Sequence, residues 1–414
     1  MVEKVITVGL RQEGESATTF TRSMEELRRL VETAGGSVVQ EIRQRKSHPE
    51  PGTFVGSGKL SDISALIKET GVRTVIFDHD LTAAQQKNIE KIVSAKIIDR
   101  TRLILDIFAR RARTKEGQLQ VELAQLNYLV PRLTGSWRGY SQQVGGIGTR
   151  GPGERKIEVE RRYVRERIKH LKKDLEDVRL HRGQARANRQ SVPLAQISLI
   201  GYTNVGKSTL LNALVDPSGS IYADDKLFAT LDPTTRRVKL PGGRMVLFTD
   251  TVGFIQKLPP DLVAAFRSTL EEVAQSTLLV HVMDATAEDR HDQKKTVIDV
   301  IKNLKADQLP MLNVYNKTDG LTENHKKALA KDGEQLISAK TKQGLDTFLS
   351  AVEEKLDQQL IDVSFHLPYS KRKLVAAIYR TGRVLSERPN ATGTSMKIKI
   401  DADQWKRISR ALEN

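Results

Sequence analysis

The sequence has no cysteine among its 414 residues, and aromatic residues make up only 5% of it. The absence of thiols excludes disulfide scaffolds, thiolate zinc sites and cysteine nucleophiles. No apolar run approaches the roughly 20 residues that a membrane-spanning helix needs. The first residues, Met1 to Val5, lack the basic and then apolar pattern of a secretory signal. We therefore expect a cytoplasmic protein of two to four domains, at roughly 150 residues each.

Positive charge is what the sequence has in excess, with a formal net charge of +16. Residues 101–195 contain 21 Lys and Arg but only 10 Asp and Glu, a net charge of +11. A solvated helical face is the ordinary explanation for a charged run. Here the excess is concentrated in under a quarter of the chain, so we predict a polyanionic partner, and RNA in particular.

Hydrophobic patterning divides the chain into four parts. Residues 1–112 alternate strands (5–8, 38–39, 72–77) with helices (24–33, 59–70, 83–93), which predicts a small α/β domain. Residues 113–190 read as a helical hairpin, and 191–360 as a second strand–helix domain. Residues 361–414 form a short tail domain, with strands expected at 363–367 and 396–400 and a helix near 372–379. The expected fold class is α/β, with a mixed, mostly parallel sheet in the third part and an α+β tail.

Two heptad seams predict the hairpin. The first consists of Leu119, Leu123, Leu126, Val130 and Leu133, and the second of Ile157, Ile168, Val164, Leu171, Leu175 and Val178. Seams of this spacing pack helices together, either as a hairpin core or as a dimeric coiled coil. We favour the hairpin and expect a monomer. Residues 183–193 are polar and rich in helix breakers, so we predict a linker there.

The loop between the two predicted helices interleaves aromatic and positive side chains with glycines. Residues 145–153 contain five glycines, which let a backbone approach closely. Stacking and phosphate pairing are how proteins hold irregular RNA. The predicted RNA-binding residues, on this loop and the helix after it, are Trp137, Arg138, Arg150, Arg155, Lys156, Arg161 and Arg162.

A phosphate-binding loop follows the strand at 197–200. The motif G-x-x-x-x-G-K-S and the helix start after it comprise Gly201, Tyr202, Thr203, Asn204, Val205, Gly206, Lys207, Ser208 and Thr209. Backbone N–H groups of such a loop cradle phosphates. Lys207 is expected to neutralise β- and γ-phosphate charge, and the Ser208 hydroxyl to bind Mg²⁺.

Three further elements follow strands in the order that a GTPase requires. The first is Asp250, Thr251, Val252 and Gly253, where the carboxylate would hold Mg²⁺ through water and the Gly253 N–H would meet the γ-phosphate. The second is Asn316, Lys317, Thr318 and Asp319, where Asp319 would accept from the guanine N1–H and N2 donors. The third is Ser338, Ala339 and Lys340, whose backbone would meet guanine O6. Together they predict a GTPase that binds GTP and GDP.

Two positions leave the catalytic chemistry open. Between the phosphate loop and Asp250, a threonine should close over Mg²⁺, and Thr230, Thr234 and Thr235 are all candidates. Phe254 stands where many GTPases have a water-positioning glutamine. Hydrolysis should therefore be slow without a partner, an ion or a backbone group. Asn204 is a candidate K⁺ ligand, with a plain loop-stabilising role as the alternative.

Some features fit a functional motif poorly. Residues 146–151 match G-x-G-x-x-G, but no strand precedes them, so we do not expect dinucleotide binding there. Residues 56–59 resemble part of a phosphate loop, but the first glycine of that motif is misplaced, so we do not expect nucleotide binding there either. We expect His79 to be a surface-loop histidine and His281 a core residue.

These residues resemble the HflX family of translation-factor-related GTPases over nearly the whole chain. The resemblance rests on residues 117–126, 145–154, 201–208, on Phe228, Ala229, Thr230, Leu231 and Asp232, and on 250–254. It implies that Thr230 is the Mg²⁺ threonine, with the catalytic group comprising Lys207, Thr230, Asp250 and Gly253. One departure is visible: the family usually continues Thr-Gln-Leu-Glu after Glu154, whereas this chain has Arg155, Lys156, Ile157 and Glu158.

The resemblance also implies a partner and an activity. Family members bind the large ribosomal subunit, reach toward its peptidyl-transferase centre, and split stalled or idle ribosomes, notably under heat stress, with hydrolysis serving release. The alternatives that share these motifs are a large-subunit assembly GTPase and an antibiotic-resistance variant. An RNA-binding scaffold with a purely structural nucleotide is the alternative outside the enzymes.

Overall fold

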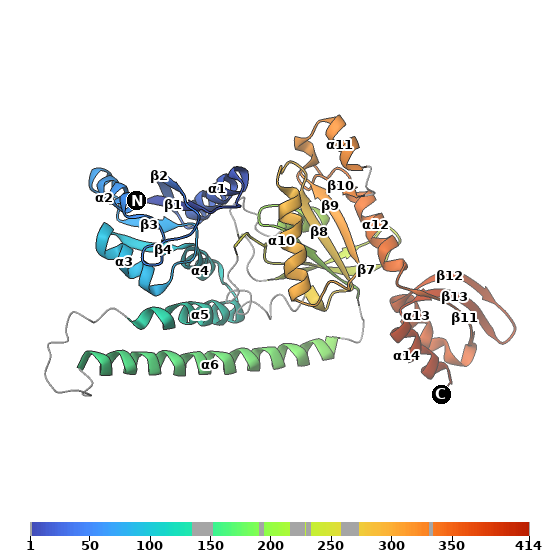
Figure 1. The fold of residues 1–414 in the computed structure, drawn as a ribbon. Coiled ribbons are helices and arrows are strands. Elements are labelled where there is room, and N and C mark those ends of the chain that lie inside the picture. The colour runs from blue at the N-terminus through green and yellow to red at the C-terminus, as the bar shows by residue number, and fades with distance from the viewer. Residues whose placement is uncertain are drawn as a thin grey trace. The chain divides into compact units, whose positions relative to one another are not determined.

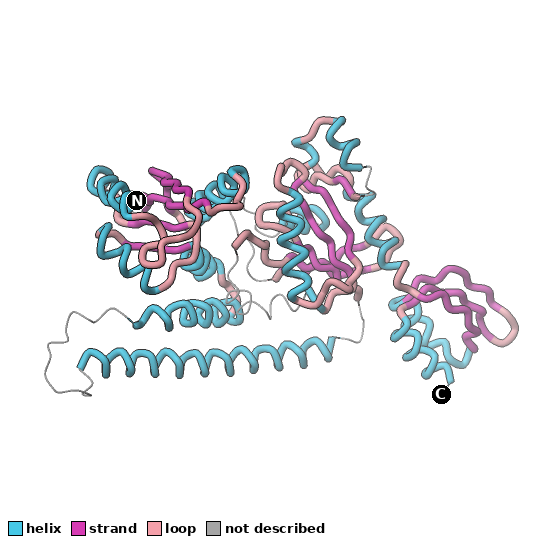
Figure 2. The backbone as a smooth tube through the Cα atoms, viewed as in Figure 1, coloured by secondary structure: helices cyan, strands magenta, loops and turns pink. Residues whose placement is uncertain are grey.

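The computed structural model describes residues 2–134, 152–189, 194–215, 228, 233–257, 273–330 and 334–413. The chain forms two compact units. One comprises residues 1–180, 224–232 and 255–268, and the other comprises 181–223, 233–254 and 269–414. Figure 1 labels the helices and strands, and Figure 2 shows where helices, strands and loops lie along the backbone.

The first unit begins with a parallel four-stranded sheet of strand order β2-β1-β3-β4. Its elements are β1 (Glu3–Arg11), α1 (Ala17–Thr33), β2 (Gly36–Arg45), α2 (Ser57–Thr70), β3 (Thr74–Phe77), α3 (Ala83–Val93), β4 (Lys96–Asp99) and α4 (Arg100–Arg111). The chain places β2 on one side of β1 and β3 on the other. The loops that follow β1 and β3 therefore diverge, which opens a crevice at the carboxyl edge of the sheet.

Local sequence explains why these elements form. All four residues of β3 are buried, as expected for a strand covered on both faces. The side chain of Ser16 accepts a hydrogen bond from the Thr19 N–H and so caps α1. Thr82 and Gln85 form a capping box at the start of α3. The predicted α/β alternation is therefore present, and β4 and α4 complete it.

The hairpin is formed by α5 (Lys115–Leu129), the short 3-10 helix η1 (Val130–Thr134) and α6 (Pro152–Arg189). Leu119 and Leu123 of α5 pack against Leu171 and Leu175 of α6 in one buried cluster. The heptad seams therefore meet within one chain, as predicted. The linker expected from residue 183 is wrong in its first part, because α6 continues to Arg189. Gln, Ala and Arg are good helix formers, and they outweigh the single Gly183.

The second unit contains a six-stranded sheet of order β10-β9-β8-β5-β7-β6, in which only β6 runs antiparallel to its neighbour. Its elements are β5 (Gln196–Ile200), α7 (Lys207–Leu214), β6 (Thr234–Lys239), β7 (Met245–Asp250), β8 (Leu278–Asp284), α10 (Arg290–Asn303), β9 (Met311–Asn316), η4 (Thr318–Gly320), α11 (Glu323–Ala330), β10 (Gln335–Leu336) and α12 (Leu345–Asp357). This mixed, mostly parallel sheet is the predicted fold class.

The C-terminal part of the second unit is a three-stranded antiparallel sheet of order β11-β13-β12. It comprises β11 (Ile361–Pro368), η5 (Tyr369–Leu374), α13 (Val375–Thr381), β12 (Gly382–Pro389), β13 (Gly393–Ile400) and α14 (Ala402–Glu413). Sequence patterning missed β12, because a bulge between Val384 and Ser386 interrupts its alternation. Among the described helices of both units, none is long and apolar enough to span a membrane.

Candidate nucleotide site

The phosphate loop links the end of β5 to the start of α7, and its conformation needs glycine at two positions. Gly201 has φ +152°, and a Cβ there would lie 2.3 Å from the Val282 carbonyl oxygen. Gly206 has φ +91°, and a Cβ there would lie 2.3 Å from Asn316 Nδ2. Both glycines therefore let the loop approach the neighbouring strands β8 and β9 more closely than any other residue could.

Lys207 lies under this loop with only 6% of its surface exposed. Its ammonium donates hydrogen bonds to the Gly201 and Tyr202 carbonyl oxygens at 3.1 and 2.9 Å. Burial lowers the Lys207 pKa to about 8, although the nearby Asp250 carboxylate works in the opposite direction. A phosphate beside this ammonium would offset the cost of burial, because an anion favours the charged form.

Two side-chain oxygens that the sequence predicted to hold Mg²⁺ meet at the start of α7. The Ser208 hydroxyl donates to Asp250 Oδ2 at 2.6 Å, and Asp250 is fully buried at the end of β7. A hydroxyl beside a carboxylate suits Mg²⁺, which prefers oxygen ligands and keeps several waters. Next along the chain, the Thr251 hydroxyl donates to the Leu199 carbonyl at 2.7 Å and so ties the end of β7 to β5.

Phe254 holds the D-x-x-G turn against the phosphate loop through its backbone. Its N–H donates to the Gly201 carbonyl at 3.1 Å, and its carbonyl accepts from the Thr203 N–H at 2.8 Å. Its side chain is 2% exposed. At Gly253, a Cβ would lie 2.9 Å from Thr203 Cα, so a side chain there would push the two segments apart. Sequence reasoning missed this backbone role, which no residue pattern signals.

Asn316 ties the guanine-reading motifs to the phosphate loop. Its Nδ2 donates to the Val205 carbonyl, and its Oδ1 accepts from the Ala339 N–H, both at 2.9 Å. One amide thus fixes three predicted motifs that lie far apart in the sequence. Lys317 has φ +65° and its ammonium pairs with Asp284 at 2.7 Å.

The Asp319 carboxylate is positioned by Ser338, whose hydroxyl donates to Asp319 Oδ1 at 2.6 Å. This hydrogen bond is the main cause that lowers the Asp319 pKa. The hydrogen bond thus favours the ionised form, which has only acceptor oxygens, as the predicted contact with guanine requires. The hydrogen bond by which Ser338 positions this carboxylate is a second feature that the sequence did not signal.

Several predicted site residues lie outside the described residues: Trp137, Arg138, Arg150, Ala229, Thr230, Leu231 and Asp232. Arg155 and Lys156 lie on α6, and Arg161 and Arg162 follow them on the same helix. Thr234 and Thr235, the other candidates for the Mg²⁺ threonine, lie on β6, where the Thr235 hydroxyl contacts that of Thr249 at 2.9 Å. Binding roles for all these residues remain predictions.

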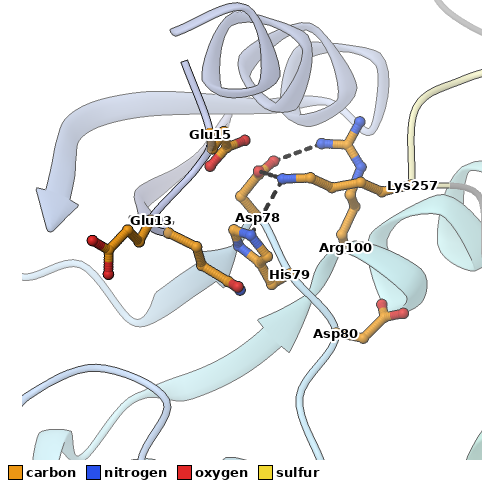
Figure 3. Close-up of a pocket in the computed structure, with 8 residues that line it drawn as sticks. Glu13, Glu15, Asp78, His79, Asp80, Arg100 and Lys257 are labelled. Carbon is orange, nitrogen blue, oxygen red and sulfur yellow. Dashed lines mark hydrogen bonds and ion pairs between the residues drawn. The ribbon is translucent and has the colours of Figure 1, made fainter. Parts of the chain in front are cut away.

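A polar cavity of about 500 Å³ lies in the first unit, in the crevice at the carboxyl edge of the N-terminal sheet. Figure 3 shows Arg100 and Lys257 pointing at the Asp78 carboxylate. Asp78 is fully buried, and both cations lie 2.6 Å from its oxygens. Burial alone would raise the Asp78 pKa, but these cations and the Ser23 and Lys257 hydrogen bonds lower it.

His79 lines the same cavity and is half-buried, which differs from the surface position that we predicted. Burial and the neighbouring Lys257 ammonium lower the His79 pKa to about 4. His281 is a core residue, as expected, with 1% of its surface exposed and its pKa lowered to about 4 by burial.

Comparison with known proteins agrees with the geometry. Three family models match successive segments: "GTP-binding GTPase N-terminal" at residues 21–109, "GTP-binding GTPase Middle Region" at 111–189 and "50S ribosome-binding GTPase" at 196–317. The GTPase HflX of Caldanaerobacter subterraneus subsp. tengcongensis is 45% identical over 409 residues, which cover 98% of this chain and 93% of that protein. The chain belongs to the HflX family of GTPases. The predicted resemblance, enzyme class and fold class are confirmed.

Other HflX proteins are similar over comparable lengths. That of Escherichia coli is 40% identical over 393 residues, covering 94% of this chain and 92% of its own. Among solved structures, a GTP-binding protein from the archaeon Sulfolobus solfataricus in complex with GDP is 23% identical, with a TM-score of 0.44. The match covers 86% of this chain and 99% of that one.

Proposed function

We propose that this HflX-family GTPase, in its GTP-bound form, binds the large ribosomal subunit and separates the subunits of stalled or idle ribosomes. The observation that carries the proposal is that a phosphate loop, tied through Asn316 to the motif expected to read guanine, occurs in one chain with a segment of net charge +11, residues 101–195, that contains the hairpin. Exposed cations along the described part of α6 support RNA as the partner: Arg162, Arg165, Lys169, Lys172 and Lys173. The hairpin tip would reach toward the peptidyl-transferase centre.

In the proposed cycle, each residue of the nucleotide site has a distinct task. Lys207 neutralises the β- and γ-phosphates, and the Gly253 N–H contacts the γ-phosphate. Ser208 and, through water, Asp250 would hold Mg²⁺, with Thr230 closing over the ion; the metal would stabilise the charge that develops on the phosphate oxygens. Asp319 and the backbone at 338–340 select guanine. Phe254 cannot orient water, so rapid hydrolysis requires a ribosomal group or K⁺ held near Asn204.

Sucrose-gradient sedimentation of ribosomes with the protein tests the proposal. With a non-hydrolysable GTP analogue, we expect 70S particles to convert to free subunits, with the protein retained on the large subunit. With GDP, we expect intact ribosomes. Intact ribosomes under all conditions would refute the splitting function, and accumulation of large-subunit precursors in a deletion strain would instead support assembly.

The hairpin's role is tested by charge neutralisation. Arg155→Gln with Lys156→Gln should weaken large-subunit binding and flatten its salt dependence, since each lost phosphate contact removes about 0.7 to 0.9 from the log–log slope. The matched control is Lys68→Gln with Lys91→Gln, two exposed lysines on α2 and α3. If both pairs of substitutions gave the same salt dependence of large-subunit binding, the hairpin tip would not be part of the interface. Equal RNA affinity with GTP and GDP would support the scaffold alternative.

A further inference from the structure

The C-terminal domain, residues 361–414, carries positive charge that the proposed function does not use. It contains 11 Lys and Arg and 5 Asp and Glu, a net charge of +6. Residues 101–195, which include the hairpin, carry +11 of the total of +16, so the residues outside these two segments together carry a net charge of −1. The entire positive excess of the protein therefore resides in two segments, the hairpin segment and this small domain.

One face of the C-terminal sheet is covered by its own helices. Leu367, Met396 and Ile398 on the strands pack with Ile378 of α13 and Ile408 of α14. Figure 1 shows both helices on the same side of β11, β12 and β13. The rings of Phe365 and Trp405 meet there, with centroids 5.0 Å apart. Because side chains alternate along a strand, the residues between these point to the opposite face.

The strand register places these alternate residues in three cross-strand rows. The first row is Asp362, Lys399 and Arg383; the second is Ser364, Lys397 and Ser386; the third is His366, Ser395 and Arg388. All of them are exposed except the half-buried Lys399. The acidic Glu387 alternates to the helix side, where it accepts a hydrogen bond from Tyr379 at 2.6 Å. Asp362 is therefore the only carboxylate in the three rows.

The first row is already engaged with α12. Arg383 forms an ion pair with Asp357 at 2.6 Å, and Lys399 lines the same recess beside Glu353 and Glu354. Lys397 lies 3.9 Å from Asp362, and both side chains are half exposed, so this pair is weak. The second and third rows thus present two cations, Lys397 and Arg388, among three serines and His366.

We propose that the second and third rows bind the phosphate backbone of RNA. We call this surface the C-terminal basic face: Ser364, Ser386, Ser395, His366, Lys397 and Arg388. Short hydroxyl side chains let a nucleic-acid backbone lie close to the strands and can donate to phosphate oxygens. The one ring in these rows is the His366 imidazole, whose Nε2 lies 3.2 Å from the Thr392 hydroxyl. The rows contain no Phe, Tyr or Trp, so the face should bind mainly through phosphates and without sequence preference.

The composition of the face favours RNA over a protein partner. A protein interface has an apolar or aromatic centre. The exposed large apolar side chains of these strands are Ile361 and Leu385, and Leu385 is the bulged residue of β12. Two separate apolar side chains do not make such a centre.

The test measures binding of the full-length chain to protein-free ribosomal RNA across a salt titration. Lys397→Gln with Arg388→Gln should lower affinity and reduce the log–log salt slope by about 1.5, since two phosphate contacts are lost. The control is Arg407→Gln with Arg410→Gln, which removes the same amount of charge from two exposed residues of α14. This helix covers the opposite face of the sheet. We expect the control to change the slope by less than half as much.

A charge-preserving variant separates binding from folding. Lys397→Arg with Arg388→Lys should keep the wild-type salt slope, and thermal melting should show that all variants are folded. Equal slopes for the face and control pairs would overturn the proposal. A loss of large-subunit binding with unchanged binding to protein-free RNA would overturn it too, because the face would then contact a ribosomal protein. If the wild-type protein failed to split ribosomes while Lys397→Gln with Arg388→Gln still reduced the salt slope of RNA binding, the proposed function would be refuted. The RNA-binding site proposed here would stand.

Discussion

The Ser208 hydroxyl donates a hydrogen bond to the Asp250 carboxylate, with 2.6 Å between the two oxygens. This contact joins the phosphate loop to the D-x-x-G element across 42 positions of sequence. It places two Mg²⁺-compatible oxygens side by side at the end of a buried strand.

Ser208→Ala should weaken GTP binding mainly in the presence of Mg²⁺. The change removes one proposed metal ligand. It also removes the hydrogen bond to buried Asp250, and leaving that acceptor unsatisfied costs about 1 to 3 kcal/mol of stability. GTP affinity measured with Mg²⁺ and with a chelator should therefore converge in this variant. Ser61→Ala, an exposed change on α2, is the control. An undiminished Mg²⁺ effect in Ser208→Ala would exclude the hydroxyl as a ligand.

Lys207→Ala and Phe254→Ala should separate nucleotide binding from later steps. Lys207→Ala removes the charge opposite the phosphates and should lower GTP affinity by at least about tenfold. Phe254→Ala leaves the backbone bonds to Gly201 and Thr203 possible, so GTP binding should persist. Its melting temperature should fall, because a buried ring is lost. Loss of GTP binding by folded Phe254→Ala would show that its ring shapes the loop.

Asp319→Asn should change base specificity. Replacing an acceptor by an amide removes the match to the guanine N1–H and N2 donors and creates a donor toward the xanthine O2. Competition between GTP and xanthosine triphosphate should therefore shift toward the latter. Asp346→Asn, which neutralises an exposed carboxylate in the first turn of α12, should leave the preference unchanged. Retained GTP preference in Asp319→Asn would place the base elsewhere.

Stability should fall as the pH drops from about 6.5 to about 4, partly because of His281. Burial lowers its pKa to about 4 in the folded protein, so in this window the unfolded chain binds a proton that the folded chain does not. His79 contributes in the same direction. His281→Gln should flatten the dependence of Tm on pH, whereas exposed His48→Gln should not. A wild-type slope in His281→Gln would contradict this assignment.

Arg100→Met should destabilise the first unit more than Lys257→Met. Arg100 is 1% exposed and neutralises buried Asp78, so its loss leaves a poorly compensated charge and costs about 3 to 5 kcal/mol. The Lys257 side chain is 32% exposed, so solvent screens its ion pair. Denaturant unfolding of the two variants tests the difference. Similar midpoints would contradict the prediction, because they would mean that the two cations stabilise Asp78 equally.

Sequence alone determined the motifs, because each is a short run whose chemistry depends on residue type and local spacing. Residues 201–208, 250–253 and 316–319 each follow an apolar strand, and parallel strands bring their carboxyl ends to one edge of a sheet. The heptad seams likewise predicted which leucines would pack, since the helical repeat is local.

Tertiary structure decided what depends on residues distant in the chain. Only packing shows that one Asn316 amide holds both Val205 and Ala339, that Ser338 lowers the Asp319 pKa, and that the Phe254 backbone braces the phosphate loop. His79 could not be placed from sequence, because its neighbours are distant in the chain: Lys257 Nζ, 178 positions away, lies 3.4 Å from its Nε2. The cross-strand rows of the C-terminal sheet arise from register, which a bulge shifts by one residue, and a period-two pattern read from one strand cannot reveal it.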